Sequence, residues 1–131
     1  MKALIIEDDP MLRRLLKRLL TRFRFEGILE AGDGEEGLAA AERERPAVIF
    51  CDIFMPKLDG IGFVERLRAM PELMDIPVVA ISAANDRDVV LRMVDLKIAD
   101  YIIKPIELEA TFKRLEKLLP TLLALGKGMR K

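Results

Sequence analysis

The sequence predicts an α/β fold in which one doubly wound parallel sheet carries helices on both faces. Short apolar runs alternate with stretches of helical periodicity five times along the chain. No linker, repeat or low-complexity segment interrupts this alternation, and a length of 131 residues suits a single hydrophobic core. The strands are expected at residues 3–6, 28–31, 47–51, 77–81 and 101–103.

The first two helices have clear start and stop signals. Asp9 can cap a helix whose first position suits Pro10, and the leucines that follow recur at spacings of three and four residues, opposite an arginine-rich outer face. Gly27 is expected to end this segment in a left-handed conformation. Asp33 followed by Glu36 has the form of a capping box, which opens an alanine-rich second helix.

The remaining helices follow the third, fourth and fifth strands. The third helix is expected to stop at Pro71, and Asn85 or Asp86 can cap the fourth. Residues 1–120 are expected to form the domain. Residues 121–131 are expected to be a frayed C-terminal tail, with no output domain, because so few residues cannot form a second core.

Composition excludes several classes of function. Basic and acidic residues both total 22, so the net charge of zero gives no general attraction to nucleic acid or to anionic membranes. No run is long enough to span a membrane, and the apolar start turns acidic too quickly for a signal peptide. The single cysteine, Cys51, cannot form an internal disulfide, which fits a reducing cytoplasm. We therefore expect a cytoplasmic protein that binds neither nucleic acid nor membranes directly.

Polar side chains follow four of the five predicted strands, at the edge where the carboxyl ends of parallel strands meet. Carboxylates brought together there repel one another unless a cation lies between them, and oxygen ligands without histidine or cysteine favour Mg²⁺. A lysine suits a phosphate group, and a hydroxyl can donate to a phosphate oxygen. This set predicts phosphoryl transfer to a carboxylate. The residues are Glu7, Asp8 and Asp9 after the first strand, Asp52 after the third, Ser82 after the fourth and Lys104 after the fifth.

Four motifs follow one another along the chain: Glu7-Asp8, the run DIFMPKLDG from Asp52 to Gly60, Ser82-Ala83, and the run YIIKP from Tyr101 to Pro105. In this order they closely resemble the motifs of the receiver domains of two-component response regulators, over about residues 2–120. The resemblance implies a flavodoxin-like five-stranded fold. It also implies that a sensor histidine kinase, or a histidine phosphotransfer protein, passes a phosphoryl group from its phosphohistidine to Asp52. Such a domain is a signalling domain, which catalyses only its own phosphoryl transfer and slow dephosphorylation.

The resemblance assigns a role to each residue of the metal site. Asp52 corresponds to the phosphoacceptor, which also contacts the metal, and Asp8 to a direct Mg²⁺ ligand. Glu7 corresponds to an acid that holds the metal through water. The backbone carbonyl of Phe54 corresponds to a further ligand. Asp9 matches a variable position, so helix capping is its first expected role and a place in the neighbourhood of the metal its second.

The resemblance also assigns the residues that respond to the phosphoryl group. Lys104 pairs with Asp52 before transfer and with the phosphoryl group after it, and Pro105 follows through a cis peptide bond. The Ser82 hydroxyl moves inward to bond the phosphoryl oxygen, and the aromatic ring of Tyr101 then swings into the vacated space. These movements reshape the face formed by the fourth helix, fifth strand and fifth helix, where a downstream protein target binds.

The sequence departs from the family pattern at two places. Lys97-Ile98 stands where many receivers have Gly-Ala, which adds bulk near the signalling face. Phe54 and Ala84 are apolar at the positions that help to orient attacking water in the family. We therefore expect the phosphorylated form to lose its phosphate slowly.

Two other functions fit the same fold. A pseudo-receiver keeps the fold as an interaction module and signals without phosphorylation. The evidence against it is the presence of Glu7, Asp8, Asp52, Ser82 and Lys104. A hydrolase with an aspartyl-phosphate intermediate needs a general acid or base, and Phe54 stands where a second acid would be expected.

Overall fold

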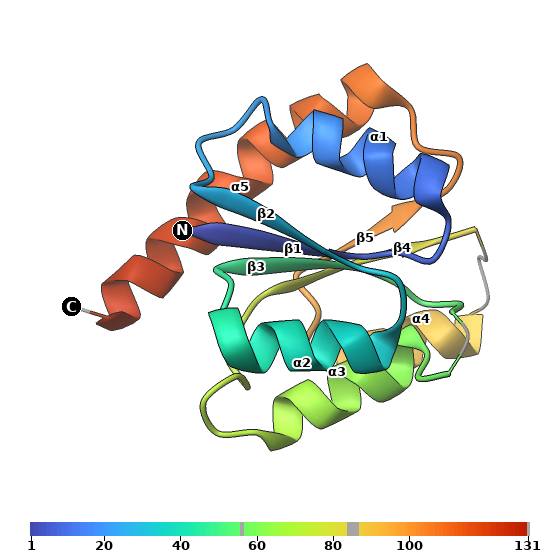
Figure 1. Ribbon diagram of the computed structural model, residues 1–131, viewed down its shortest axis with the longest axis vertical. Coiled ribbons are helices and arrows are strands. Elements are labelled where there is room, and N and C mark those ends of the chain that lie inside the picture. Colours follow the sequence, from blue (N-terminus) through green and yellow to red (C-terminus); the bar gives the residue numbers. More distant parts are fainter. Residues whose placement is uncertain (56, 84–86, 131) are drawn as a thin grey trace.

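The computed structural model describes residues 1–55, 57–83 and 87–130, with side chains up to residue 123. Five parallel strands form one sheet in the order β2-β1-β3-β4-β5. The chain therefore extends outward from β1 in both directions, which confirms the predicted doubly wound α/β fold (Figure 1). The strands are β1 (Lys2–Ile6), β2 (Gly27–Ala31), β3 (Val48–Asp52), β4 (Val78–Ser82) and β5 (Asp100–Ile103).

Helices cover both faces of the sheet, with α1 and α5 on one face and α2, α3 and α4 on the other (Figure 1). This arrangement follows from right-handed crossovers that leave β1 in opposite directions. The helices are α1 (Pro10–Leu20), α2 (Gly34–Glu44), α3 (Gly60–Ala69), α4 (Arg87–Asp95) and α5 (Leu108–Arg130). Within the described part of the chain, no helix combines the length and the apolar character that crossing a membrane requires.

The hydrophobic core has two halves, one on each side of the sheet. Successive residues of β1 alternate between them, so Leu4 and Ile6 pack under α2 and α3, whereas Ala3 and Ile5 pack under α1 and α5. Every residue of β3 and β4 is buried. Buried central strands are typical of a parallel sheet with helices on both faces.

Side-chain caps fix where the helices begin. Asp9 Oδ1 accepts a hydrogen bond of 2.9 Å from the Met11 amide, and Asp33 Oδ1 accepts one of 2.8 Å from the Glu36 amide. The Glu36 carboxylate accepts from the amide of Gly32 at 3.3 Å, one residue before the cap, so the expected capping box is present in a shifted form. The predicted caps of α4, Asn85 and Asp86, lie outside the described residues.

Two predictions about the ends of helices are wrong. Helix α1 ends at Leu20, and Gly27 is the first residue of β2, where it pairs with Lys2. No described glycine has a positive φ. Helix α5 continues through Pro120 to Arg130, so the backbone after Pro120 is helical up to that residue and not a frayed tail. The division into a domain and a tail stays a prediction.

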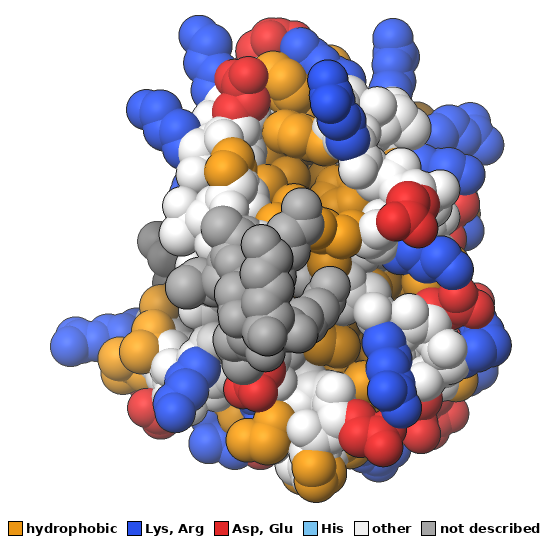
Figure 2. All heavy atoms as spheres, turned by 90° about the vertical axis from the view of Figure 1, so that its left-hand side faces the viewer, with side chains coloured by type: hydrophobic (Ala, Val, Ile, Leu, Met, Phe, Trp, Pro, Cys, Tyr) orange, Lys and Arg blue, Asp and Glu red, His pale blue; other side chains and the backbone are white. Residues whose placement is uncertain are grey.

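The two edges of the sheet differ in character. Figure 2 shows the side on which the chain begins, where apolar side chains form a strip between lysines and arginines. A groove of about 480 Å³ at these amino ends of the strands is lined by Pro77, Leu96 and Leu122, with Arg68 and Lys97 beside them. The acidic residues singled out in the sequence lie at the opposite, carboxyl edge.

Candidate functional site

The carboxyl edge of the sheet brings together the predicted site residues. Glu7 and Asp8 follow β1, and Asp52 ends the neighbouring strand β3. Ligand oxygens from these three carboxylates all lie within 4.8 Å of one another. Ser82 ends β4 and Lys104 follows β5, and the Lys104 amide donates a 2.8 Å hydrogen bond to the Ser82 carbonyl. The strand order therefore explains how residues distant in sequence come to share one site.

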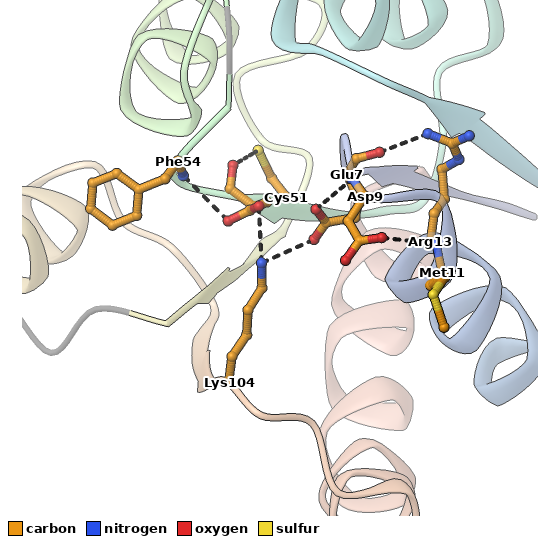
Figure 3. A network of polar contacts seen from close by, with 8 residues as sticks. Glu7, Asp9, Met11, Arg13, Cys51, Phe54 and Lys104 are labelled. Atoms are coloured by element: carbon orange, nitrogen blue, oxygen red, sulfur yellow. Dashed lines mark hydrogen bonds and ion pairs between the residues drawn. The ribbon is translucent and has the colours of Figure 1, made fainter.

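The ammonium group of Lys104 lies between two of the acids. Its Nζ donates a 3.1 Å hydrogen bond to Asp52 Oδ2 and forms an ion pair of 3.3 Å with Glu7 Oε1 (Figure 3). Burial alone would lower the pKa of Lys104, but its hydrogen bond with Asp52 and the charges of Asp52 and Glu7 raise that pKa overall. Lys104 therefore stays charged. The peptide bond to Pro105 is cis, as expected.

Glu7 is buried at the mouth of the site, with only 1% of its surface exposed. Its Oε2 accepts a 3.1 Å hydrogen bond from the Asp9 amide, whereas Oε1 accepts no hydrogen bond from the described residues and meets Lys104 only as an ion pair. Burial is the largest cause that raises the pKa of Glu7 to about 7. The Asp9 hydrogen bond opposes the shift, and the charge of Asp52 adds to it. Near neutral pH this acid is thus close to half protonated without a cation.

Asp52 is held by the loop that follows it. Its Oδ1 accepts a 3.3 Å hydrogen bond from the Phe54 amide, while the Phe54 ring is half exposed and points away from the carboxylate (Figure 3). The Gly60 amide donates a 2.8 Å bond to the Ile53 carbonyl, which closes the loop. A Cβ on Gly60 would lie 2.5 Å from Ile53 Cα and 2.6 Å from the Asp52 carbonyl oxygen, so the tight loop requires glycine there.

Two further predicted residues lie where the sequence placed them. Ser82 is fully buried at the end of β4, beside the site. Tyr101 lies in β5, is partly buried, and packs against the core half beneath α3 and α4. Its carbonyl accepts a hydrogen bond of 3.2 Å from Arg114. Ala84 lies outside the described residues. The switching roles of Ser82 and Tyr101, and the metal role of the Phe54 carbonyl, stay predictions.

The donor set fits a hard divalent cation. Glu7, Asp8 and Asp52 offer only oxygen atoms, which suit Mg²⁺. Glu7 Oε1 is buried and meets Lys104 as an ion pair but accepts no hydrogen bond from the described residues, so it has room for a further partner such as a cation or its water. Asp8 is exposed, so a cation held here keeps access to water and to an incoming phosphate.

Sequence reasoning missed one contact of this site. The sequence places Arg13 on the arginine-rich outer face of α1, but its Nη1 donates a 2.8 Å hydrogen bond to the backbone carbonyl of Glu7. Its Nε forms an ion pair of 3.4 Å with Glu30 Oε1. The only signal in the sequence is position: Arg13 lies one turn after the helix cap Asp9, where a side chain can reach back to the end of the preceding strand.

A parallel five-stranded sheet between two helical layers, with carboxylates and a lysine at its carboxyl edge, defines a flavodoxin-like domain with an acidic site. The model of the response regulator receiver domain matches residues 3–116. The chain belongs to this family, whose members are signalling domains of two-component systems that generally bind Mg²⁺ in an acidic pocket.

Curated relatives agree with this family. The probable C4-dicarboxylate response regulator DctR of Bacillus subtilis is 36% identical over 117 residues, which make up 88% of this chain and 51% of that protein. The probable chemotaxis protein CheY of Rhizobium etli is 34% identical over 108 residues, 82% of this chain and 84% of that protein. This chain therefore spans about half the length of DctR but most of the CheY protein.

Solved structures have the same fold. The phosphorylated cyanobacterial phytochrome response regulator RcpA gives a TM-score of 0.79 at 28% identity, covering 92% of this chain and 94% of that chain. The Mn²⁺-bound form of the response regulator Rcp1 gives a TM-score of 0.77 at 25% identity, covering 88% and 89%. This chain is thus similar to one receiver named as phosphorylated and to one named as metal-bound.

Proposed function

We propose that Asp52 accepts a phosphoryl group from the phosphohistidine of a sensor histidine kinase or a histidine phosphotransfer protein, with Mg²⁺ held by Glu7, Asp8 and Asp52. The main support is the position of Lys104 Nζ, 3.1 Å from Asp52 Oδ2 and 3.3 Å from Glu7 Oε1. A lysine bound to the acceptor carboxylate, beside a second buried acid, is suited to neutralise charge during phosphoryl transfer.

The transfer needs little from this chain beyond position and charge. An oxygen of the Asp52 carboxylate forms the new bond to phosphorus, the bond between phosphorus and the donor imidazole nitrogen breaks, and the electron pair stays on that nitrogen. This chain contains no histidine, so the donor imidazole belongs to a partner. Bound Mg²⁺ supplies positive charge to the phosphoryl oxygens. Lys104 supplies a second positive charge, and the Phe54 amide orients Asp52 through its 3.3 Å hydrogen bond.

We propose that Ser82 and Tyr101 change position when the phosphoryl group is bound. The Ser82 hydroxyl lies at the end of β4 next to the acceptor strand, and Tyr101 pairs in register with Ala80 of β4. Helix α4 and strand β5 carry exposed apolar side chains: Leu91 and Val94 on α4, and Ile103 on β5. These side chains support the α4-β5-α5 face as the binding surface for a downstream protein.

The proposal is tested by phosphate uptake. The purified chain is incubated with acetyl phosphate and Mg²⁺, and the phosphorylated residue is identified by mass spectrometry. We expect uptake at Asp52 that is lost in Asp52→Ala and on removal of Mg²⁺ by EDTA. A folded chain that takes up no phosphate, yet binds its partner protein, would instead be a pseudo-receiver. Multiple turnover on a phosphate ester would identify a hydrolase.

A further inference from the structure

Arg13 joins the metal-binding edge of the sheet to helix α1 and strand β2. Its Nη1 donates to the Glu7 carbonyl at 2.8 Å, and its Nε pairs with Glu30 Oε1 at 3.4 Å. Figure 3 shows the guanidinium group reaching the Glu7 backbone from the side opposite Lys104. Arg13 therefore acts on the backbone of an acid whose side chain faces the site.

The Glu7 carbonyl belongs to the peptide unit that joins Glu7 to Asp8. The Glu7 amide donates to the Ala31 carbonyl at 3.0 Å, and the Glu7 side chain accepts from the Asp9 amide at 3.1 Å. Arg13 is the donor to the remaining polar group of Glu7, its carbonyl oxygen. The hydrogen bond thus fixes the rotation of the peptide from which Asp8 leaves the strand.

The direction of Asp8 depends on this backbone. Its carboxylate is exposed and accepts no hydrogen bond from the residues that the structure describes, so no neighbouring donor sets its position. A hydrogen bond that orients the Glu7–Asp8 peptide consequently orients both acids toward Asp52. Donors that orient metal ligands commonly control how tightly the metal is bound.

Glu30 holds the guanidinium group in place. One carboxylate oxygen pairs with Arg13, and the other, Oε2, accepts a 3.1 Å hydrogen bond from Lys17 Nζ. Lys17 lies one turn after Arg13 on α1, and Glu30 immediately precedes Ala31, whose carbonyl holds the Glu7 amide. The same end of β2 therefore supports Glu7 directly, and also indirectly through Arg13.

We propose that Arg13 is a positioning residue for the divalent cation and acts through the Glu7 carbonyl, not through its own charge. This inference rests on the proposed function, which assigns the cation to Glu7, Asp8 and Asp52. The two modes of action predict that removing Arg13 changes the affinity for the cation in opposite directions. Removing a nearby positive charge strengthens cation binding, whereas releasing the Glu7–Asp8 peptide weakens it.

Lys17 provides a matched control, because Lys17→Met removes a positive charge from the same Glu30 carboxylate without touching Glu7. Mg²⁺ is titrated into the wild type, Arg13→Met and Lys17→Met, with no phosphodonor, and the amide NMR shifts of residues 7–9 are followed. We expect Arg13→Met to bind Mg²⁺ about three- to tenfold more weakly than Lys17→Met, the size expected for one lost hydrogen bond. Equal or tighter binding by Arg13→Met overturns the proposal, as does a wild type that binds no Mg²⁺.

Two further measurements separate positioning from general loss of structure. In phosphorylation by acetyl phosphate, Arg13→Met should raise the Mg²⁺ concentration for half-maximal rate, with little change in the rate at saturating Mg²⁺. Arg13→Lys keeps the charge but cannot hold the Glu7 carbonyl and Glu30 together, so it should bind Mg²⁺ with intermediate affinity. Because the titrations use no phosphodonor, they decide the role of Arg13 even if Asp52 is not phosphorylated.

Discussion

Lys104 Nζ lies 3.1 Å from Asp52 Oδ2, so the cation that follows β5 is held against the acid that ends β3. The same ammonium group pairs with Glu7 at 3.3 Å. Before any phosphate arrives, Lys104 therefore occupies the place where positive charge is needed between two acids. Its removal should affect the transfer step more than the binding of Mg²⁺.

We predict that Lys104→Met slows phosphorylation of Asp52 by acetyl phosphate on the order of a hundredfold, because one preorganised charge on the transferring group is lost. Mg²⁺ affinity should stay the same or increase, since a competing cation has gone. The matched control is Lys57→Met, a lysine of the neighbouring loop that pairs with Asp33 at 3.4 Å. An unchanged phosphorylation rate in Lys104→Met would contradict the assigned role.

Glu7 should make the stability of the metal-free domain depend on pH. Burial is the main cause that raises its pKa from 4.5 to about 7 in the folded state. As the pH rises through this interval the unfolded state ionises first, so the folded state binds more protons and the free energy of unfolding falls, by at most about 3 kcal/mol. The stability contributed by protonated Glu7 is complete at low pH and lost above about pH 7.

The sequence contains no histidine, the side chain that most often titrates in this interval. Urea unfolding in EDTA between about pH 5 and pH 8 should show the decline in the wild type and a flatter profile in Glu7→Gln. Mg²⁺ should reverse the decline at the higher pH, because a cation favours the ionised carboxylate. Wild-type stability that rises across this interval would contradict the raised pKa.

Phe54 is predicted to prolong the life of the phosphorylated state. Its amide binds Asp52 while its half-exposed ring offers attacking water no hydrogen bond. Phe54→Asn should therefore speed the decay of labelled phosphoprotein, by about tenfold or more. Met74→Asn, which changes another exposed apolar residue away from the site, should leave the decay rate unchanged. Loss of phosphate from the wild type within seconds would refute the prediction.

The positions of the acids and the lysine could be predicted from the sequence because parallel strands deliver their carboxyl ends to one edge. Asp52 and Lys104 needed only the alternation of strands and helices to be placed together. Arg13 could not be placed, because its partner is a backbone carbonyl. Every type of residue has this carbonyl, so the sequence does not indicate which residue is the partner.

The errors at Gly27 and Pro120 have tertiary causes. Gly27 follows turns closed by the amides of Arg22 and Phe23, and pairing with β1 then keeps it extended. Pro120 lacks the amide that would bond the Glu116 carbonyl, but both residues are exposed, so water can satisfy that carbonyl. At Pro120 the packing of α5 on the core therefore outweighs the tendency of proline to end a helix.

Lys97 follows α4 with a φ of 57°, a left-handed conformation that is unfavourable for a residue with a Cβ. Lys97→Gly should raise the free energy of unfolding by about 1 kcal/mol, because glycine adopts this conformation without strain. Lys97→Ala, which removes the long side chain but keeps the Cβ, should bring no such gain. Equal stabilisation by both variants in urea unfolding would assign the effect to the side chain and contradict the argument from backbone strain.

Arg68 ties three segments together at the amino edge of the sheet. Its Nη1 donates to the carbonyls of Met74 at 2.9 Å and Ile76 at 2.8 Å, and its Nε donates to the carbonyl of Leu96 at 2.9 Å. Its Nη2 also donates to the carbonyl of Lys97 at 3.3 Å. Arg68→Met should lower the free energy of unfolding by about 2–3 kcal/mol, because four carbonyls lose charged donors. Arg66→Met, an exposed change on the same turn of α3, should shift it by no more than about 0.5 kcal/mol.

Hydrogen exchange distinguishes the loss of the Arg68 hydrogen bonds from general destabilisation. In Arg68→Met the amides of Lys97 and Ile98, which bond the last turn of α4 at 2.9 and 3.3 Å, should lose protection more than amides in β1 and β3. A uniform loss of protection would mean that Arg68 contributes only to overall stability. A local loss would show that Arg68 holds the end of α4, the helix that carries the exposed Leu91 and Val94, in its place beside β5.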